Sequence, residues 1–193
     1  MEVELYNKYD LLYRTAVVNP NKIAAIKKIT DNILFHKKRY EDLINTIKTT
    51  YSQSTIPWYF VAVVHHMEAD CLFDRHLHNG DPLLHRTIHV PAGRPSKGNP
   101  PFTWEQSAFD ALCNVSQLHL VQDWRIPALL RRIEGYNGFG YSNKGINSPY
   151  LWSYTSQYGV APNIGKYISD GHFDPKAIST QIGAVAILKQ LIN

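Results

Sequence analysis

Apolar residues recur every three or four positions through the first 55 residues, which is the spacing of one face of a helix. From residue 23 onward they are Ile23, Ile26, Ile33, Tyr40, Ile44 and Ile47. Asn19-Pro20 has the composition of a helix start, and the polar residues 49–55 have that of a helix end. We therefore expect residues 1–55 to form an N-terminal helical extension packed on the core.

Residues 56–70 are apolar on almost every side, and a helix with that character is normally buried. Pro57 suits its first turn, where the missing N–H has no helical partner to lose. Glu68 stands near its C-terminal end. The pattern predicts a central helix that ends close to a carboxylate.

Glycine and proline interrupt the pattern between residues 71 and 103. Thr87-Ile88-His89-Val90 lies between these breaks and has the composition of a short strand. We expect a small, loop-rich β lobe inserted between helices.

Helical patterns return after residue 103. Thr103-Trp-Glu-Gln106 is a capping box, in which the Thr hydroxyl and the Gln side chain satisfy backbone donors reciprocally. An apolar stripe over residues 126–133 predicts a helix ended by Gly135. Asp174-Pro175 has the composition of the start of a last helix. The expected fold class is α+β, mostly α-helical with a small β lobe.

Composition narrows the class of protein. Of the 193 residues, 19% are charged and 12% aromatic, which excludes a disordered chain. The net charge of +4 favours an anionic partner, whether nucleic acid, membrane or cell-wall polymer. The basic residues of the N-terminal part fit a solvated helix face. Cys71 and Cys113 form no CxxC motif, and we interpret both as small buried hydrophobic residues.

No apolar run reaches the ~18 residues of a membrane-spanning helix. The first residues also lack the basic and apolar regions of a signal peptide. We expect a soluble chain made in the cytoplasm without a classical signal peptide. Action outside the cytoplasm would then require export or release by a phage.

Glu68 is the first residue with a chemical interpretation. A carboxyl at the end of an apolar helix is partly desolvated and faces the negative end of the helix dipole. Both effects disfavour the anion, so we expect a raised pKa, which suits a general acid.

Histidines are the second feature, since six of the nine lie between His65 and His89. Zinc proteases of the zincin type have two His at positions i and i+4 of a helix, with a Glu between them. The stretch His65-His-Met-Glu68 lacks this spacing. We therefore expect no bound metal. In this interpretation the imidazoles hydrogen-bond to the backbone of a turn-rich lobe.

The third feature is a glycine–aromatic loop that begins with Gly135-Tyr136-Asn137-Gly138. Aromatic rings beside amides and hydroxyls suit sugar rings, and they suit single-stranded bases as well. Packing of the same rings in the core is an equal alternative. The aromatic residues concerned are Tyr136, Phe139, Tyr141, Tyr150, Trp152 and Tyr154.

These three features, in this order, resemble the lysozyme-like superfamily, specifically goose-type lysozymes and soluble lytic transglycosylases. Val63-Val-His-His-Met-Glu68 is similar to the end of that superfamily's catalytic helix, and residues 135–138 are similar to its Ala-Tyr-Asn-Ala-Gly loop. Further stretches resemble bacterial and phage cell-wall hydrolases, at residues 77–82, 90–95, 101–105 and 148–153. The resemblance implies a lysozyme-like catalytic domain over residues 56–193.

The resemblance also implies roles for individual residues. Glu68 would be the general acid of a peptidoglycan glycosidase, either a muramidase or a lytic transglycosylase, that cleaves the MurNAc–GlcNAc β-1,4 bond. Asp81 would be the base that a hydrolase needs, with Asp70 and Asp74 as weaker candidates. The residues expected to bind substrate or tune the acid are His65, His78, Tyr136, Asn137, Tyr141, Trp152 and Tyr154. Such an enzyme, of the endolysin or bacteriolytic kind, needs no cofactor and no metal.

The partner implied is the glycan strand of peptidoglycan, bound by a monomer, with neither nucleic acid nor membrane insertion involved. Two other classes of protein remain open. One is a metal-dependent peptidoglycan peptidase or amidase that uses the His65–His89 cluster. The other is a non-catalytic glycan-binding module that uses the aromatic residues.

Overall fold

The computed structural model describes residues 2–169 and 171–192. Helices make up 52% of the chain, and a small antiparallel sheet of two strands accompanies them. A mostly helical α+β fold class is thereby confirmed. The chain divides into two compact units, Met1–Asp31 with Arg125–Asn193, and Asn32–Trp124. The boundary expected at residue 55 coincides with neither division.

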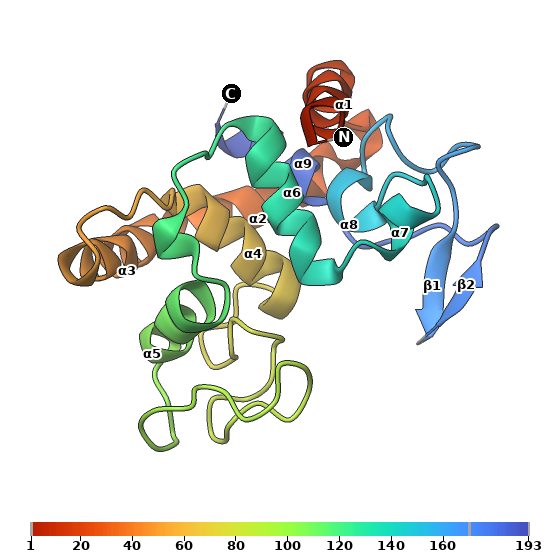
Figure 1. Ribbon diagram of the computed structural model, residues 1–193. Helices are drawn as coiled ribbons and strands as arrows, with labels where there is room; N and C mark the ends of the chain where they lie inside the picture. The colour runs from red at the N-terminus through yellow and green to blue at the C-terminus, as the bar shows by residue number, and fades with distance from the viewer. Residues whose placement is uncertain (1, 170, 193) are drawn as a thin grey trace. The chain divides into compact units, whose positions relative to one another are not determined.

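The first unit combines the two ends of the chain (Figure 1). Helix α1 packs along α6, and α8 packs against both α6 and α9. Strands β1 and β2 form an antiparallel hairpin in which Tyr167 pairs with Phe173. The elements are α1 (Glu2–Thr15), η1 (Pro20–Lys22), α6 (Ile126–Asn137), α7 (Gly140–Asn143), α8 (Pro149–Trp152), β1 (Lys166–Ser169), β2 (His172–Asp174) and α9 (Ala184–Leu191).

The second unit is built around a central helix, as the sequence predicts. Its elements are α3 (Lys37–Thr50), α4 (Trp58–Ala69), α5 (Trp104–Phe109), the π-helical turn η2 (Asp110–Val115) and η3 (Leu118–Leu120). Residues 60–65 of α4 are wholly buried on every face. Helix α3 packs against α4 and α5. Helix α2 (Ile23–Phe35) begins in the first unit and ends in the second.

Local signals in the sequence predict several helix ends correctly. The side chain of Asn19 accepts a hydrogen bond from the N–H of Asn21 at the start of η1. The capping box at Thr103 and Gln106 is present with both of its bonds. The N-terminal lysines lie on a solvated face, where Lys27 pairs with Asp31. Both cysteines are free and buried, as expected.

The predicted N-terminal helix is interrupted at His36, between α2 and α3. The buried stripe that follows is carried by Tyr40, Leu43 and Ile47, while Ile44 is only partly buried. None of the helices among the described residues has the length and apolar character needed to cross a membrane.

The strand expected at Thr87–Val90 is wrong. The backbone N–H groups of Ile88 and His89 donate to the carboxylate of Asp81, and that of Thr87 donates to the carbonyl of Arg94. These donors are therefore satisfied without a neighbouring strand. The segment that joins α4 to α5 is a long run of turns, drawn in yellow-green in Figure 1.

Two predicted helix ends near the C-terminus are also wrong. Helix α6 continues through Gly135 to Asn137, and Gly138, with φ of +75°, follows it. Asp174 does cap the N–H groups of Lys176 and Ala177 at a turn, but no helix continues from it. The last helix begins only at Ala184.

Candidate functional site

Glu68 occupies the last turn of α4, where its side chain is partly exposed. The helix ends directly beyond it, because Asp70 and Cys71 both adopt left-handed backbone conformations, with φ of 49° and 59°. Their N–H groups donate to the carbonyls of His66 and His65, at 2.9 and 3.3 Å. These bonds cap the orphan carbonyls of the helix and fix the backbone around Glu68.

The turn at Gly80 presses against this helix end. Gly80 has φ of +76°, and a Cβ atom built on it would lie 2.5 Å from the carbonyl oxygen of Glu68. Only glycine permits so close an approach of two backbones. The turn-rich lobe therefore packs directly against the backbone of Glu68.

His65 belongs to the core, not to a binding surface, contrary to its predicted role in binding substrate. Its exposed fraction is 0%, and its ring lies 4.7 Å from that of Phe73 and from that of Trp104. Nε2 donates to the carbonyl of Leu72, and Nδ1 accepts from the hydroxyl of Tyr40. Both bonds suit a neutral imidazole. Burial lowers the pKa of His65 to about 4.

His78 is also buried, in a polar network that joins the lobe to α5 and η2. Its Nε2 donates to Asp110, whose carboxylate accepts two further bonds from the guanidinium of Arg94. Ser107 hydrogen-bonds to the rings of both His76 and His78. Every one of these groups is satisfied inside the protein. The expectation that histidines hydrogen-bond to the backbone of the lobe is correct for His76, whose Nε2 donates to the carbonyl of His85. It is wrong for His78, which bonds to side chains of α5 and η2, and contact of His78 with substrate is not supported.

We expect the protein to lose stability as the pH falls from 6.5 toward 4. Burial lowers the pKa of both His65 and His78 to about 4, from the ordinary value of 6.5. Between these pH values the unfolded chain binds protons that the folded chain cannot, so the folded state is fully favoured only above pH 6.5. For His65 the loss is about 3 kcal/mol.

Urea unfolding at pH 7.5 and pH 4.5 measures this loss. His65→Gln should show a smaller difference between the two pH values than the wild-type chain. His172→Asn is the matched control, because His172 is exposed, and it should keep the full difference. Equal pH dependence in all three chains would contradict a role for His65.

Asp81 holds the loop that follows it. Its Oδ2 accepts from the N–H groups of Ile88 and His89, and its Oδ1 accepts from the ring of His89 at 2.6 Å. Burial raises the pKa of Asp81, but these bonds outweigh it and bring the pKa below its usual value. A carboxylate with a lowered pKa is a weak base. The geometry therefore supports a structural role in place of the predicted catalytic one.

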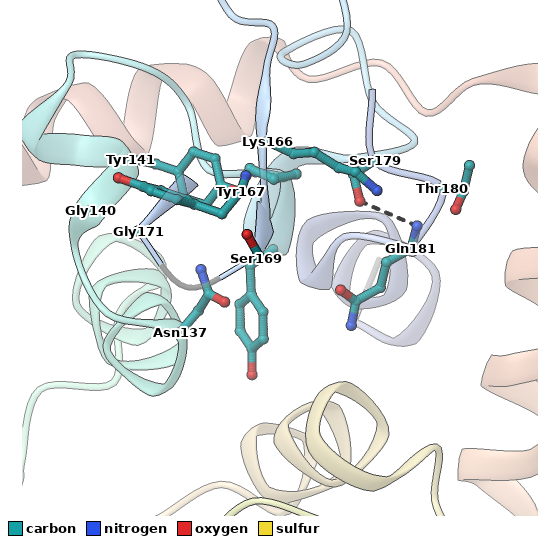
Figure 2. Close-up of a pocket in the computed structure, with 12 residues that line it drawn as sticks. Asn137, Gly140, Tyr141, Lys166, Tyr167, Ser169, Gly171, Ser179, Thr180 and Gln181 are labelled. Atoms are coloured by element: carbon teal, nitrogen blue, oxygen red, sulfur yellow. Dashed lines mark hydrogen bonds between the residues drawn. The ribbon is translucent and has the colours of Figure 1, made fainter. Parts of the chain in front are cut away.

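The first unit contains a pocket that we call the hairpin pocket, with a volume of about 450 Å³. Asn137 at the end of α6 and the buried Tyr141 on α7, two of the residues expected to contact substrate, are among its lining residues. In Figure 2, Asn137 lies on the opposite side of the pocket from Ser179 and Gln181. The full lining is Asn137, Gly140, Tyr141, Pro149, Tyr150, Lys166, Tyr167, Ser169, Gly171, Ser179, Thr180 and Gln181.

The other aromatic candidates lie elsewhere in the same unit. Tyr136 is half-buried on α6 and does not line the hairpin pocket. Trp152 is 1% exposed, so it packs in the core and presents no ring to a ligand. Tyr154 donates from its hydroxyl to the carbonyl of Thr180, and Lys22 lies 4.9 Å from its ring centre. Core packing, one of the two alternatives for this segment, is correct for Trp152.

A buried carboxylate that the sequence analysis missed fixes the wall of the pocket. Glu134 is 1% exposed on α6 and accepts hydrogen bonds from Ser142, at 2.5 Å, and from Tyr9 of α1. These bonds tie α1 and α7 to α6. Since α7 carries Tyr141, the N-terminal helix takes part in positioning the pocket.

The hairpin residues Lys166, Tyr167 and Ser169 were missed as well. Their strands are too short and too polar for a clear period-2 pattern. The available signal was a pair of glycines, Gly165 and Gly171, with φ of +105° and +72°, which bracket the first strand and its turn.

Within residues 2–169 and 171–192, no three His, Cys, Asp or Glu side chains form a group that could hold a metal ion. The geometry thus gives no support to a metal site in the His65–His89 cluster. Comparisons with protein-family models, curated proteins and solved structures find no match for this chain.

Proposed function

We propose that this protein is a peptidoglycan glycosidase that cleaves the MurNAc–GlcNAc β-1,4 bond with Glu68 as general acid. The observation that carries the proposal is the setting of Glu68. It is a partly exposed carboxyl on the last turn of a mostly buried helix, with its backbone held by the left-handed turn at Asp70 and by Gly80. A general acid requires such fixed placement, together with access to substrate.

In the proposed reaction Glu68 gives its proton to the glycosidic oxygen as the bond to the anomeric carbon breaks. The hairpin pocket supports a sugar ligand, because tyrosine rings and polar side chains line the same hollow. The net charge of +4 also suits an anionic wall polymer.

The hydrogen bonds that Asp81 accepts bear on the choice between hydrolysis and transglycosylation. An inverting hydrolase needs a second carboxylate as base, about 6.5–9.5 Å from the acid. Asp81, the leading candidate, is occupied by the loop around His89. A lytic transglycosylase avoids this need, since the 6-hydroxyl of the muramoyl residue attacks in place of water. The proton of that hydroxyl passes to the Glu68 carboxylate, which has already given its own proton to the leaving oxygen. We therefore propose transglycosylase chemistry.

Mass spectrometry of peptidoglycan digested by the purified protein tests the proposal. We expect muropeptides with 1,6-anhydro ends. Reducing muramic acid ends would keep the glycosidase assignment and overturn the transglycosylase version. Products cleaved in the peptide stem, or no products from any peptidoglycan tested, would overturn the assignment to a glycosidase.

A further inference from the structure

Another pocket lies wholly within the second unit, and we call it the α3–α5 pocket because residues of α3 and α5 line it together with part of the turn-rich segment. Its volume is about 530 Å³, which is within the usual range of small-molecule sites. Glu68 is not among its lining residues. The proposed cleavage therefore makes no use of this pocket.

Two aromatic rings, those of Tyr51 and Phe109, lie on the α3–α5 pocket. Their planes are within 24° of each other, and their centres are 6.1 Å apart. His119 stacks on Tyr51 at 4.0 Å and does not itself line the pocket. The ring of Tyr51 is thus held by a neighbour that leaves the pocket open. Aromatic faces fixed in this way suit the apolar face of a sugar ring.

Polar groups on the same pocket offer both donors and acceptors. The hydroxyls of Thr46 and Thr50 donate to carbonyls of their own helix, so their oxygens can still accept. Gln106 uses its carbonyl oxygen in the capping box and keeps its NH₂ group to donate. Asn114 donates through Nδ2 to Asp110 and keeps its carbonyl oxygen to accept.

The carboxylates on the pocket have cationic partners. Asp110 pairs with Arg94 at 2.7 Å, and Glu105 pairs with Arg39 at 2.6 Å. A lining that both donates and accepts suits hydroxyl and amide groups, because each of these can also do both. A phosphate group, by contrast, has acceptor oxygens to offer and matches only half of such a lining. The chemistry of the pocket therefore favours an amide-bearing sugar.

The wall that carries Asn114 is the π-helical turn η2 (Asp110–Val115). At its end the N–H of Ser116 donates to the carbonyl of Ala111, five residues earlier, at 3.0 Å. Turns of this kind are frequent at functional sites. Asp110 is 2% exposed and joins the turn to Arg94, so this wall is in place before any ligand arrives. A preformed wall limits the entropy cost of binding.

We propose that the α3–α5 pocket binds an N-acetylglucosamine unit of a glycan strand and takes no part in its cleavage. The sugar ring lies against Tyr51 and Phe109. The NH₂ group of Gln106 donates to the acetamido carbonyl, and the carbonyl of Asn114 accepts from the acetamido N–H. The inference rests on the proposed function only for the identity of the polymer, since peptidoglycan supplies this sugar along its whole length.

NMR titration of the Glu68→Gln chain tests the inference without turnover. One ligand is the β-1,4-linked GlcNAc trimer, and the other is the β-1,4-linked glucose trimer, which has no acetamido groups. We expect the GlcNAc trimer to shift the backbone resonances of Lys97 and Asn114, which line the pocket, and the glucose trimer to bind several-fold more weakly. Read from the same resonances, Tyr51→Ala should weaken binding of the GlcNAc trimer about tenfold, through loss of the ring face.

Asn114→Ala is the second variant, and its fold should survive because Asn114 is exposed. Loss of one hydrogen bond should weaken binding about fivefold, read from Lys97. Tyr6→Ala is the matched control, because Tyr6 is a half-buried tyrosine of α1 that does not line the pocket. It should bind as the parent chain does. Urea unfolding checks that each variant is folded.

Four results would overturn the inference: no shifts at the pocket, equal binding of the two trimers there, unchanged affinity in both pocket variants, or an equal loss in Tyr6→Ala. If the protein then still yields 1,6-anhydro products, the proposed function stands. Binding of the GlcNAc trimer that depends on Tyr51, in a protein that cleaves no glycan, would remove the proposed function and keep the pocket.

Discussion

Glu68→Gln is expected to lower the rate of peptidoglycan cleavage by about 100- to 10,000-fold, the usual contribution of general acid catalysis. The amide has nearly the shape of the carboxyl, but it has no acidic proton to give to the glycosidic oxygen. The fold should survive, since the side chain is only partly buried at the end of α4. Release of soluble muropeptides measures the rate, and circular dichroism with urea unfolding reports the fold.

Glu41→Gln is the matched control for this change. Glu41 lies on α3 in the same unit and pairs with Lys37 on the surface, at 3.5 Å. It should retain normal cleavage. A Glu68→Gln chain with near-normal turnover would remove Glu68 from the role of acid. A wild-type chain that binds glycan, cleaves none, and keeps its affinity in Glu68→Gln would identify a glycan-binding module.

The second large effect is expected for Gly80→Ala. The new Cβ atom would lie 2.5 Å from the carbonyl oxygen of Glu68, so the turn and the end of α4 must separate. Left-handed backbone costs an alanine about 1–2 kcal/mol, and overpacking adds about 1–3 kcal/mol. We expect a clear loss of stability together with a loss of cleavage, because the backbone that positions Glu68 shifts.

Gly93→Ala separates these two costs. Gly93 lies in the same run of turns with nearly the same φ, +75°, but nothing lies within 4 Å of its Cβ position. It should show the backbone cost alone and keep cleavage. Urea unfolding and muropeptide release measure both variants. Equal effects of the two substitutions would contradict the close fit of the turn against α4.

Helix α4 and the capping box show what local sequence determines. A segment that is apolar all round has only one stable environment, the core, and so residues 56–70 predict a central helix without knowledge of its neighbours. Thr103 and Gln106 satisfy donors within one turn, so no distant partner decides the outcome. The cysteines are buried for the same general reason.

The predictions that are wrong concern residues whose structure depends on distant partners. Thr87–Val90 has strand-like residues, but Asp81 captures the amides that a neighbouring strand would need. The sequence predicts functional roles for His65, His78 and Asp81. In the structure each of them is hydrogen-bonded to other residues of the protein, and residue spacing alone does not reveal those partners. The hairpin at residues 166–174 depends on contacts of Tyr167 with Tyr141, far away in the chain.

By itself the sequence determined a mostly helical protein with a central apolar helix, and it placed Glu68 at the end of that helix. Those features follow from periodicity and capping, which act over one or two helical turns. Only the tertiary structure decided that His65 and His78 are buried and hydrogen-bonded, that Asp81 holds a loop, and that Lys166 and Ser169 share a pocket with Asn137. Burial and long-range hydrogen bonds set these outcomes, because they depend on which distant residues the fold brings together.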